Sequence, residues 1–81
     1  MTARFAGRVA LVTGAGQGVG AATATELAKG GATLVLNDVD DAKLQASAEQ
    51  LRALGATVST YAGSVTDASI VAAMAEAAIA E

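Results

Sequence analysis

Three short segments of the chain have the hydrophobic pattern of β-strands. Residues 9–12 are continuously apolar and run directly into a glycine-rich stretch, which favours a strand buried on both faces over a helix. Residues 33–37 repeat this pattern and lead into an acidic turn. Residues 57–62 alternate instead, with Val58 and Thr60 on one side, and this alternation predicts a less deeply buried strand at the edge of a sheet.

Helices are predicted between these strands. After Gly18, apolar residues recur near helical spacing until the glycine pair at 30–31, and two adjacent glycines are a strong stop signal. Asp40 or Asp41 can accept amide hydrogens at the start of a second helix, which would end at Gly55. The inner face of this helix is predicted to consist of Leu44, Ala48, Leu51 and Leu54.

A third helix is predicted from Asp67 to the last residue, with Thr66 as its N-cap and apolar side chains around much of its circumference. The alternation of strands and helices with short joins indicates parallel strands linked by right-handed crossovers, in the sheet order third, second, first. A doubly wound sheet would next place a fourth strand beside the first. We therefore interpret the chain as the first half of a doubly wound parallel-sheet (Rossmann) fold of the α/β class, with the order β-α-β-α-β-α.

The composition excludes several kinds of site. The chain has no cysteine and no histidine, which removes disulfide frameworks, thiolate and imidazole metal ligands and imidazole-based triads. Its net charge is −3 and its five basic residues are scattered, so nucleic acid is not an expected partner. Residues 1–7 do not read as a secretory signal, and the apolar residues 70–80 are too few to span a bilayer. A cytoplasmic chain that does not contact membranes is expected.

The turn after the first strand carries the clearest chemical signal. Residues 13–20 read Thr-Gly-Ala-Gly-Gln-Gly-Val-Gly. A glycine just after a strand allows a tight turn, and glycines at a helix entrance let backbone amides approach a pyrophosphate at the positive end of the helix dipole. No lysine follows these glycines, which excludes a triphosphate-binding P-loop. The segment predicts dinucleotide binding, and the alternative is a loop that merely turns tightly.

Asp38 ends the second strand about 20 residues beyond the glycines, where a carboxylate can accept hydrogen bonds from the adenosine ribose. Its alternative role is that of a simple turn or cap residue. A 2′-phosphate at this place would meet the Asp38 charge, with no arginine or lysine at Gln17 or Val39 to compensate it. NAD is therefore favoured over NADP.

The spacing Thr-Gly-x-x-x-Gly-x-Gly resembles that of the short-chain dehydrogenase/reductase family. The lead-in Phe-Ala-Gly-Arg-Val-Ala-Leu-Val at residues 5–12 is similar as well, and so are the Leu-Val-Leu-Asn-Asp and Val-Thr-Asp segments at 34–38 and 65–67. A competing register, Gly16-x-Gly18-x-x-Ala21, matches the fingerprint of the medium-length dehydrogenases. Both registers bind the same kind of ligand, so the choice between them concerns the family and not the cofactor.

The resemblance implies a set of cofactor-binding residues: Gly14, Gln17, Gly18, Val19, Gly20, Asp38, Ser64 and Val65. In the family an Asp-Val segment after the third strand holds the adenine, and Ser64 with Val65 stands in its place here, so one hydrogen-bond acceptor remains without its charge. Asp67 is interpreted as a first-turn helix residue rather than a ligand contact.

No catalytic residue and no metal ligand is predicted. The asparagine, serine, tyrosine and lysine that perform catalysis in the family cannot be placed, because the only tyrosine, Tyr61, is followed four positions later by Val65. The resemblance thus implies that residues 1–81 are a dinucleotide-binding half-domain, incomplete relative to the family. The implied function is that of the NAD-binding N-terminal segment of an oxidoreductase that transfers hydride between NAD(H) and an alcohol or carbonyl substrate.

Two other functions stay open at this stage. The chain could be a stand-alone dinucleotide-binding module without catalysis, or the open edge of its first strand could recruit another chain. Residues 1–81 alone are expected to be inactive. A small-molecule substrate would bind only in a longer chain, and the homo-oligomers typical of the family are possible there.

Overall fold

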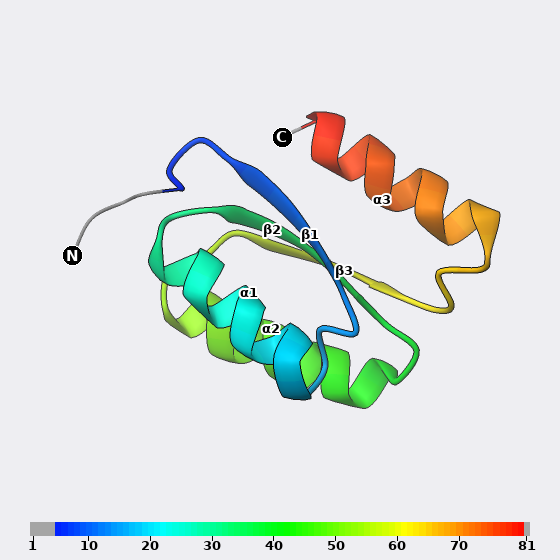
Figure 1. The fold of residues 1–81 in the computed structure, drawn as a ribbon, viewed down its shortest axis with the longest axis horizontal. Helices are drawn as coiled ribbons and strands as arrows, with labels where there is room; N and C mark the ends of the chain where they lie inside the picture. The colour runs from blue at the N-terminus through cyan, green and yellow to red at the C-terminus, as the bar shows by residue number, and fades with distance from the viewer. Residues whose placement is uncertain (1–4, 81) are drawn as a thin grey trace.

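The computed structural model describes residues 5–80 and confirms the six predicted elements in the predicted order (Figure 1). They are the strands β1 (Val9–Thr13), β2 (Thr33–Asp38) and β3 (Val58–Ala62) and the helices α1 (Gly18–Lys29), α2 (Asp41–Ala53) and α3 (Ala68–Ala80). Strand β2 pairs in parallel with β1 on one side and with β3 on the other. The predicted order, third, second, first, is this arrangement read from the opposite edge. The predicted α/β fold is therefore confirmed.

The helices cover the two faces of the sheet unequally. Helices α1 and α2 lie side by side on one face, and α3 lies alone on the other (Figure 1). Because all three strands are parallel, the loops that leave them, β1–α1, β2–α2 and β3–α3, lie at the same edge of the sheet. This carboxyl edge is where open α/β sheets bind their ligands.

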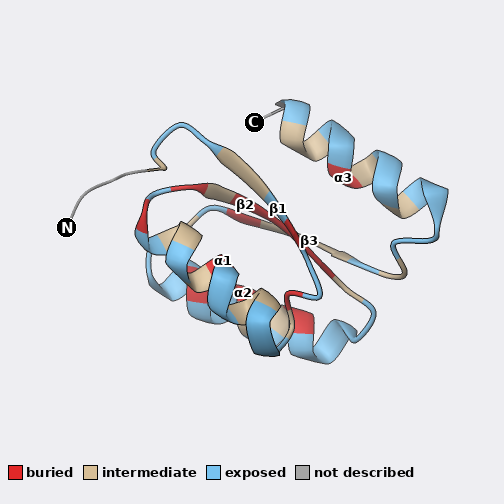
Figure 2. Ribbon diagram, in the orientation of Figure 1, coloured by how far each residue is buried: buried red, intermediate tan, exposed pale blue. Residues whose placement is uncertain are grey.

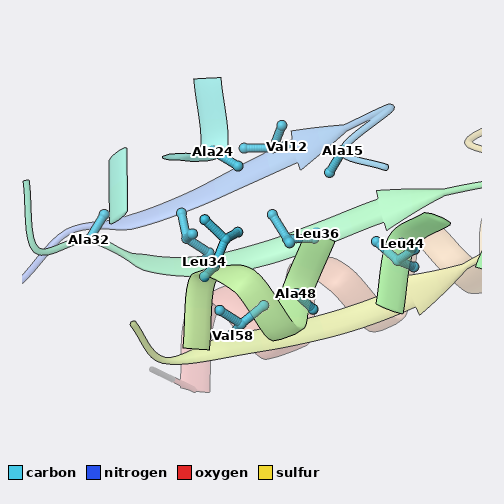
Figure 3. Packing of buried hydrophobic residues seen from close by; sticks show 10 residues of the cluster. Val12, Ala15, Ala24, Ala32, Leu34, Leu36, Leu44, Ala48 and Val58 are labelled. Carbon is cyan, nitrogen blue, oxygen red and sulfur yellow. The ribbon is translucent and has the colours of Figure 1, made fainter. Parts of the chain in front are cut away.

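The main core lies between the sheet and the layer formed by α1 and α2. Leu34 and Leu36 of the central strand β2 are fully buried, as are Leu44 and Ala48 of α2 (Figure 3). Leu51 completes the helical spacing on the same side of α2. These residues confirm most of the predicted inner face of this helix.

Leu54 was predicted to belong to this inner face, and that prediction is wrong. Helix α2 ends at Ala53, Leu54 is its C-cap, and the Leu54 side chain is 57% exposed. The chain turns back toward β3 at Gly55, which has a φ of 92°. The residue therefore lies beyond the last turn of α2 that packs on the sheet.

The opposite face of the sheet is only partly covered (Figure 2). Met74 of α3 is buried, whereas Val71 and Ile79 of the same helix are exposed. In β1, Val12 is buried toward the main core, but Leu11 is 49% exposed. The prediction that the first strand is buried on both faces is therefore wrong for the described residues, because one helix covers this face and two cover the other.

The start of α3 also differs from its prediction. The Asp67 carboxylate accepts hydrogen bonds from the backbone amide of Ser69 at 2.9 Å and from its hydroxyl at 2.7 Å. The Thr66 hydroxyl pairs with the Ser64 hydroxyl at 2.7 Å instead of capping the helix. The ionised side chain is the stronger acceptor, so Asp67 stabilises the helix start and the assignment of Thr66 as N-cap is wrong. Within residues 5–80, none of the helices combines the length and apolarity that crossing a membrane requires.

Candidate cofactor-binding site

The loop between β1 and α1 is fastened to the end of β2 by its own backbone. The amide of Ala15 donates a hydrogen bond to the carbonyl oxygen of Asn37 at 2.9 Å. The next amide, that of Gly16, donates to the Asp38 carboxylate at 2.8 Å. The Ala15 side chain is fully buried in the main core. The glycine loop and the end of the neighbouring strand therefore form one unit.

Glycine is required in this loop for two separate reasons. Gly14 and Gly18 have φ angles of 64° and 61°, in the left-handed region that favours glycine. Gly20 lies so close to the preceding turn that a Cβ atom there would overlap the carbonyl oxygen of Gly14. A Cβ atom on Gly16 would lie 2.8 Å from a carboxylate oxygen of Asp38. A side chain would therefore strain the backbone at Gly14 and Gly18, and at Gly16 and Gly20 it would force neighbouring atoms to move.

Helix α1 begins without a side-chain cap. Gln17 is its N-cap residue, in an extended conformation, and makes no capping hydrogen bond to the helix. Its side-chain oxygen instead accepts a hydrogen bond of 2.6 Å from the Lys43 ammonium group of α2. The first amides of α1 thus have no side-chain acceptor from the cap, and they lie at the positive end of the helix dipole. This arrangement suits an anionic group.

Asp38 is held as a carboxylate beside the glycine loop. One of its oxygens accepts from Gly16, and the other accepts from the backbone amide of Asp40 at 3.0 Å. The amide of Asp40, followed by those of Gly16 and Val39 and by the nearby charge of Lys43, lowers the pKa of Asp38 below its ordinary value, against a smaller opposing effect of desolvation. Asp38 is therefore ionised at neutral pH and fixed in orientation.

Asn37 joins the next loop to the same edge. Its side chain is only 2% exposed, and its amide nitrogen donates to the carbonyl oxygens of Tyr61 at 2.8 Å and Gly63 at 2.9 Å. The backbone amide of Gly63 in turn donates to the carbonyl oxygen of Asp38 at 3.0 Å. The chain that leaves β3 is thereby fixed directly beside the end of β2.

Ser64 and Val65 follow this anchored glycine. The Ser64 hydroxyl accepts a hydrogen bond of 3.1 Å from the Thr66 amide, so its oxygen is already used within its own turn. Val65 is half exposed, and Val19 at the start of α1 is largely exposed. All the sequence-predicted site residues therefore lie on the β1–α1 turn, the first turn of α1, the β2 end and the β3–α3 turn, at one edge of the sheet (Figure 1). Hydrogen bonds join the glycine loop to Asp38, and they join Gly63, next to Ser64, to the end of β2.

Sequence reasoning missed two residues of this edge. Asn37 could have been found, because it is a polar side chain directly after the three apolar residues 34–36 of the central strand, where a buried amide needs partners. Lys43 gave no comparable signal, because it is 26 residues from Gln17 and meets it only through the packing of α1 beside α2. Residues 5–80 contain no cluster of three or more acidic, histidine or cysteine residues suited to a metal ion.

The chain matches the family model described as short chain dehydrogenase over residues 8–81. It belongs to the short-chain dehydrogenase family. The stated resemblance is thus confirmed, and the match favours the Thr-Gly-x-x-x-Gly-x-Gly register over the medium-length register at Gly16.

Relatives of known structure reproduce the fold of this short-chain dehydrogenase chain. A short chain dehydrogenase/reductase from Burkholderia phymatum, solved in complex with NAD, is 43% identical with a TM-score of 0.87, and the match covers 94% of this chain and 27% of that one. A metagenomic short-chain oxidoreductase, solved in complex with NADP, is 36% identical with a TM-score of 0.83 and coverages of 95% and 35%.

Among curated proteins, the 1-deoxy-11-beta-hydroxypentalenate dehydrogenase of Streptomyces exfoliatus is 39% identical over 71 residues, which are 88% of this chain and 26% of that protein. The chain spans between 13% and 28% of the length of curated relatives that it matches along most of its own length. The family is thus an oxidoreductase family that binds nicotinamide dinucleotides, and the chain corresponds to a small part of such proteins.

Proposed function

We propose that the chain is the NAD-binding N-terminal segment of a short-chain dehydrogenase/reductase that transfers hydride between NAD(H) and an alcohol or carbonyl substrate. The observation that carries this proposal is the hydrogen bond between the Gly16 amide and the Asp38 carboxylate. It holds an ionised acceptor beside an uncapped, glycine-lined helix start. A dinucleotide needs both features, since its pyrophosphate is anionic and its ribose hydroxyls are hydrogen-bond donors.

The residues present fit such a cofactor. The backbone of Gln17, Gly18 and Val19 would face the pyrophosphate, and the close approach allowed by Gly14 and Gly20 leaves the loop backbone unobstructed. Asp38 would accept hydrogen bonds from the adenosine ribose, and the turn with Ser64 and Val65 would border the adenine. When bound, the nicotinamide ring of the cofactor supplies the hydride chemistry, and this segment orients the cofactor.

The proposed preference for NAD over NADP comes from the Asp38 charge. A 2′-phosphate about 4 Å from a carboxylate is repelled by up to about 4 kcal/mol at an effective dielectric constant near 20, and solvent reduces this to about 1–3 kcal/mol. Such a difference corresponds to about tenfold to a hundredfold in affinity. The relatives of known structure include both an NAD complex and an NADP complex, so the preference has to be tested on this chain.

Catalysis belongs, in this proposal, to a longer chain. Proton transfer to or from the substrate needs an acid/base of suitable pKa beside the nicotinamide, and residues 1–81 contain no histidine and no tyrosine with a lysine four positions later. The substrate site and any homo-oligomer contact would come from other parts of such a protein. A stand-alone binding module is the second candidate, favoured by one observation: hydrogen bonds within residues 15–63 fasten both the glycine loop and the β3–α3 turn to the end of β2.

The test is an NMR titration of the purified chain with NAD⁺, followed at the amides of the glycine loop. We expect weak, saturable binding with the largest shifts at Gly16, Gly18 and Val19. Asp38→Asn should weaken this binding by about tenfold, because it removes the charged acceptor. Asp41→Asn is the matched control, since it makes the same charge change on the exposed first turn of α2.

Three outcomes decide the proposal. Equal affinities for the two variants would contradict the proposed role of Asp38. No shift of loop amides in the folded wild-type chain would contradict cofactor binding altogether. NADH oxidation by the purified chain with a panel of aldehydes and ketones, abolished by Gly18→Val, would overturn the expectation that these residues alone are inactive.

A further inference from the structure

We infer that Lys43 is a specificity-determining residue of this site: its ammonium group faces the place of the cofactor's 2′-position and weakens the discrimination against NADP that Asp38 alone would impose. This inference rests on the proposed function. The immediate neighbours of this place, Gln17 and Val39, are neutral, and Lys43 adds a positive charge to them.

Both ends of the Lys43 side chain are placed by contacts with the glycine loop. Its ammonium nitrogen donates to the Gln17 side-chain oxygen at 2.6 Å. Its Cβ atom lies so close to the loop that a Cβ atom built on Gly16 would be 2.9 Å from it. The backbone amide of Lys43 donates to the Asp40 carboxylate at 3.1 Å, which fixes the first turn of α2. The lysine thus extends along the loop from Gly16 to Gln17.

The same loop residue, Gly16, donates to the Asp38 carboxylate, so the lysine and the aspartate meet at one backbone position. The charge of Lys43 also lowers the pKa of Asp38, by less than the backbone amides of Asp40, Gly16 and Val39 do. A phosphate esterified to a ribose held by Asp38 would therefore enter a region that contains the carboxylates of Asp38 and Asp40 and one ammonium group, that of Lys43. NAD has no charge at this position, so Lys43 should affect NADP far more than NAD.

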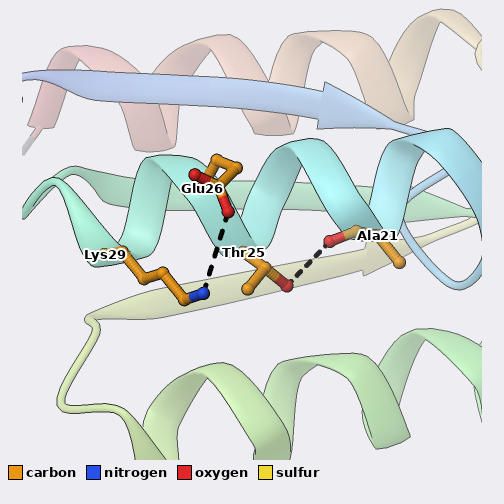
Figure 4. Close-up of polar contacts among 4 residues, drawn as sticks. All are labelled: Ala21, Thr25, Glu26 and Lys29. Atoms are coloured by element: carbon orange, nitrogen blue, oxygen red, sulfur yellow. Dashed lines mark hydrogen bonds and ion pairs between the residues drawn. The ribbon is translucent and has the colours of Figure 1, made fainter.

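Other basic side chains of residues 5–80 are held away from this place. Lys29 lies in the last turn of α1, 3.8 Å from Glu26, at the opposite end of that helix from Gln17 (Figure 4). Arg52 lies in the last turn of α2 and donates to the carbonyl oxygen of Val58 at 2.9 Å, at the start of β3. Arg8 precedes β1 and is likewise at the amino edge of the sheet. Lys43 is therefore the cation that the described fold brings to the carboxyl edge.

The experiment compares the dissociation constants of NAD⁺ and NADP⁺ at fixed ionic strength for the wild-type chain, Lys43→Met, Lys43→Arg and Lys29→Met. Methionine keeps the apolar stem and removes the charge, and its helix propensity is similar to that of lysine. Because an exposed cation near a phosphate contributes modestly in water, Lys43→Met should weaken NADP⁺ binding by about fivefold. NAD⁺ binding should change by less than about twofold. Lys43→Arg should keep the wild-type ratio, and Lys29→Met should change neither constant.

Each other outcome overturns the inference in a recognisable way. An equal loss of both cofactors in Lys43→Met would assign Lys43 to a group that NAD and NADP share, such as the pyrophosphate. Unchanged constants, or the same loss of NADP⁺ binding in Lys29→Met, would show that Lys43 has no particular role in specificity. If the folded wild-type chain binds neither nucleotide, the proposed function itself fails and this inference fails with it.

Discussion

Two loops at the carboxyl edge of the sheet use their hydrogen-bonding groups in opposite ways. In residues 14–17, the backbone amides of Ala15 and Gly16 bond to the end of β2, and the cap residue of α1 leaves the first helical amides without a side-chain acceptor. In residues 63–67, the side chains of Ser64 and Asp67 accept from the amides of Thr66 and Ser69 and satisfy the start of α3 internally.

The difference explains why only one of two neighbouring helix starts is suited to a phosphate. An uncapped helix start offers amide donors and a positive dipole end to a ligand. A helix start capped by an ionised carboxylate has used a donor and carries a negative charge that repels anions. The β1–α1 loop therefore suits an anionic ligand better than the β3–α3 loop does, and in the proposed function the β3–α3 loop only borders the site. The predictions below test this contrast.

The largest effect is expected from Gly20→Ala. In the first turn of α1, Gly20 packs directly against the backbone of Gly14 in the β1–α1 loop, and any side chain at residue 20 would prevent this contact. The new methyl group would overlap the Gly14 carbonyl oxygen, a backbone atom that cannot rotate away. We expect a loss of about 3 kcal/mol in the free energy of unfolding, measured by urea denaturation with circular dichroism. Thr23→Ala, at an exposed position of the same helix, is the control. Equal stabilities of these two variants would contradict the close packing of the loop.

A smaller effect is expected from Asn37→Leu, which detaches the β3–α3 loop from β2. Leucine is close in volume but leaves the carbonyl oxygens of Tyr61 and Gly63 without their donor. The expected cost is about 2 kcal/mol, with faster hydrogen exchange at the Gly63 amide. Thr57→Ala, exposed just before β3, should stay within about 0.5 kcal/mol of wild type. Unchanged exchange at Gly63 in the leucine variant would show that Asn37 does not hold this loop.

The features that could be predicted from the sequence are those contained in a local pattern of residues. The glycine loop was recognisable because its residues are consecutive and follow an apolar run, so one local pattern contains both the turn and the backbone proposed to bind the cofactor. The order of the elements and the inner face of α2 were recognisable for the same reason, since hydrophobic periodicity is local. Asp38 required only a spacing of about 20 residues beyond the glycines.

Some errors and omissions come from the points at which helices start or end, and others come from contacts between elements. Leu54 fits the helical periodicity, but the helix ends before it, and periodicity does not fix the point at which a chain turns away. Thr66 and Asp67 are both good caps, and the choice between them depends on the hydroxyl of Ser64. The Lys43–Gln17 pair depends on how α1 and α2 pack, which no local pattern contains. Exposure of Leu11 depends on how much of the sheet a single helix covers.

A pH titration compares the carboxylates of the two loops directly. The pKa of Asp38 is lowered by the amides of Asp40 and Gly16, and that of Asp67 is lowered by the hydroxyl and then the amide of Ser69. Because both folded pKa values lie below the ordinary value of 3.8, each group stabilises the fold above that pH and loses its contribution as the pH falls through its folded pKa. Stability should therefore be level near neutrality and should decline in acid.

The loops should differ in which amides report this titration. The Gly16 amide signal should follow Asp38, and the Ser69 amide signal should follow Asp67, with both midpoints below 3.8. Asp38→Asn should abolish the first titration and leave the second unchanged. A Gly16 signal that still titrates in this variant would show that another carboxylate faces the loop.

The smallest effect is expected from Ser64→Asp, which would give the β3–α3 loop a charged acceptor for the adenine of the cofactor. A carboxylate at this position can keep accepting from the Thr66 amide, as the serine hydroxyl does at 3.1 Å, so the turn should be retained. Its second oxygen could then accept from the exocyclic amine of the adenine, and the charge assistance should strengthen NAD binding by about 1 kcal/mol, or about fivefold.

Thr57→Asp adds the same charge at the opposite edge of the sheet and should leave binding unchanged at 0.15 M salt, because more distant charges are screened there. Titration calorimetry of both variants measures the difference. Weaker NAD binding by a folded Ser64→Asp chain would show that the adenine does not border this loop, and the contrast between the two loops would then concern the phosphates alone.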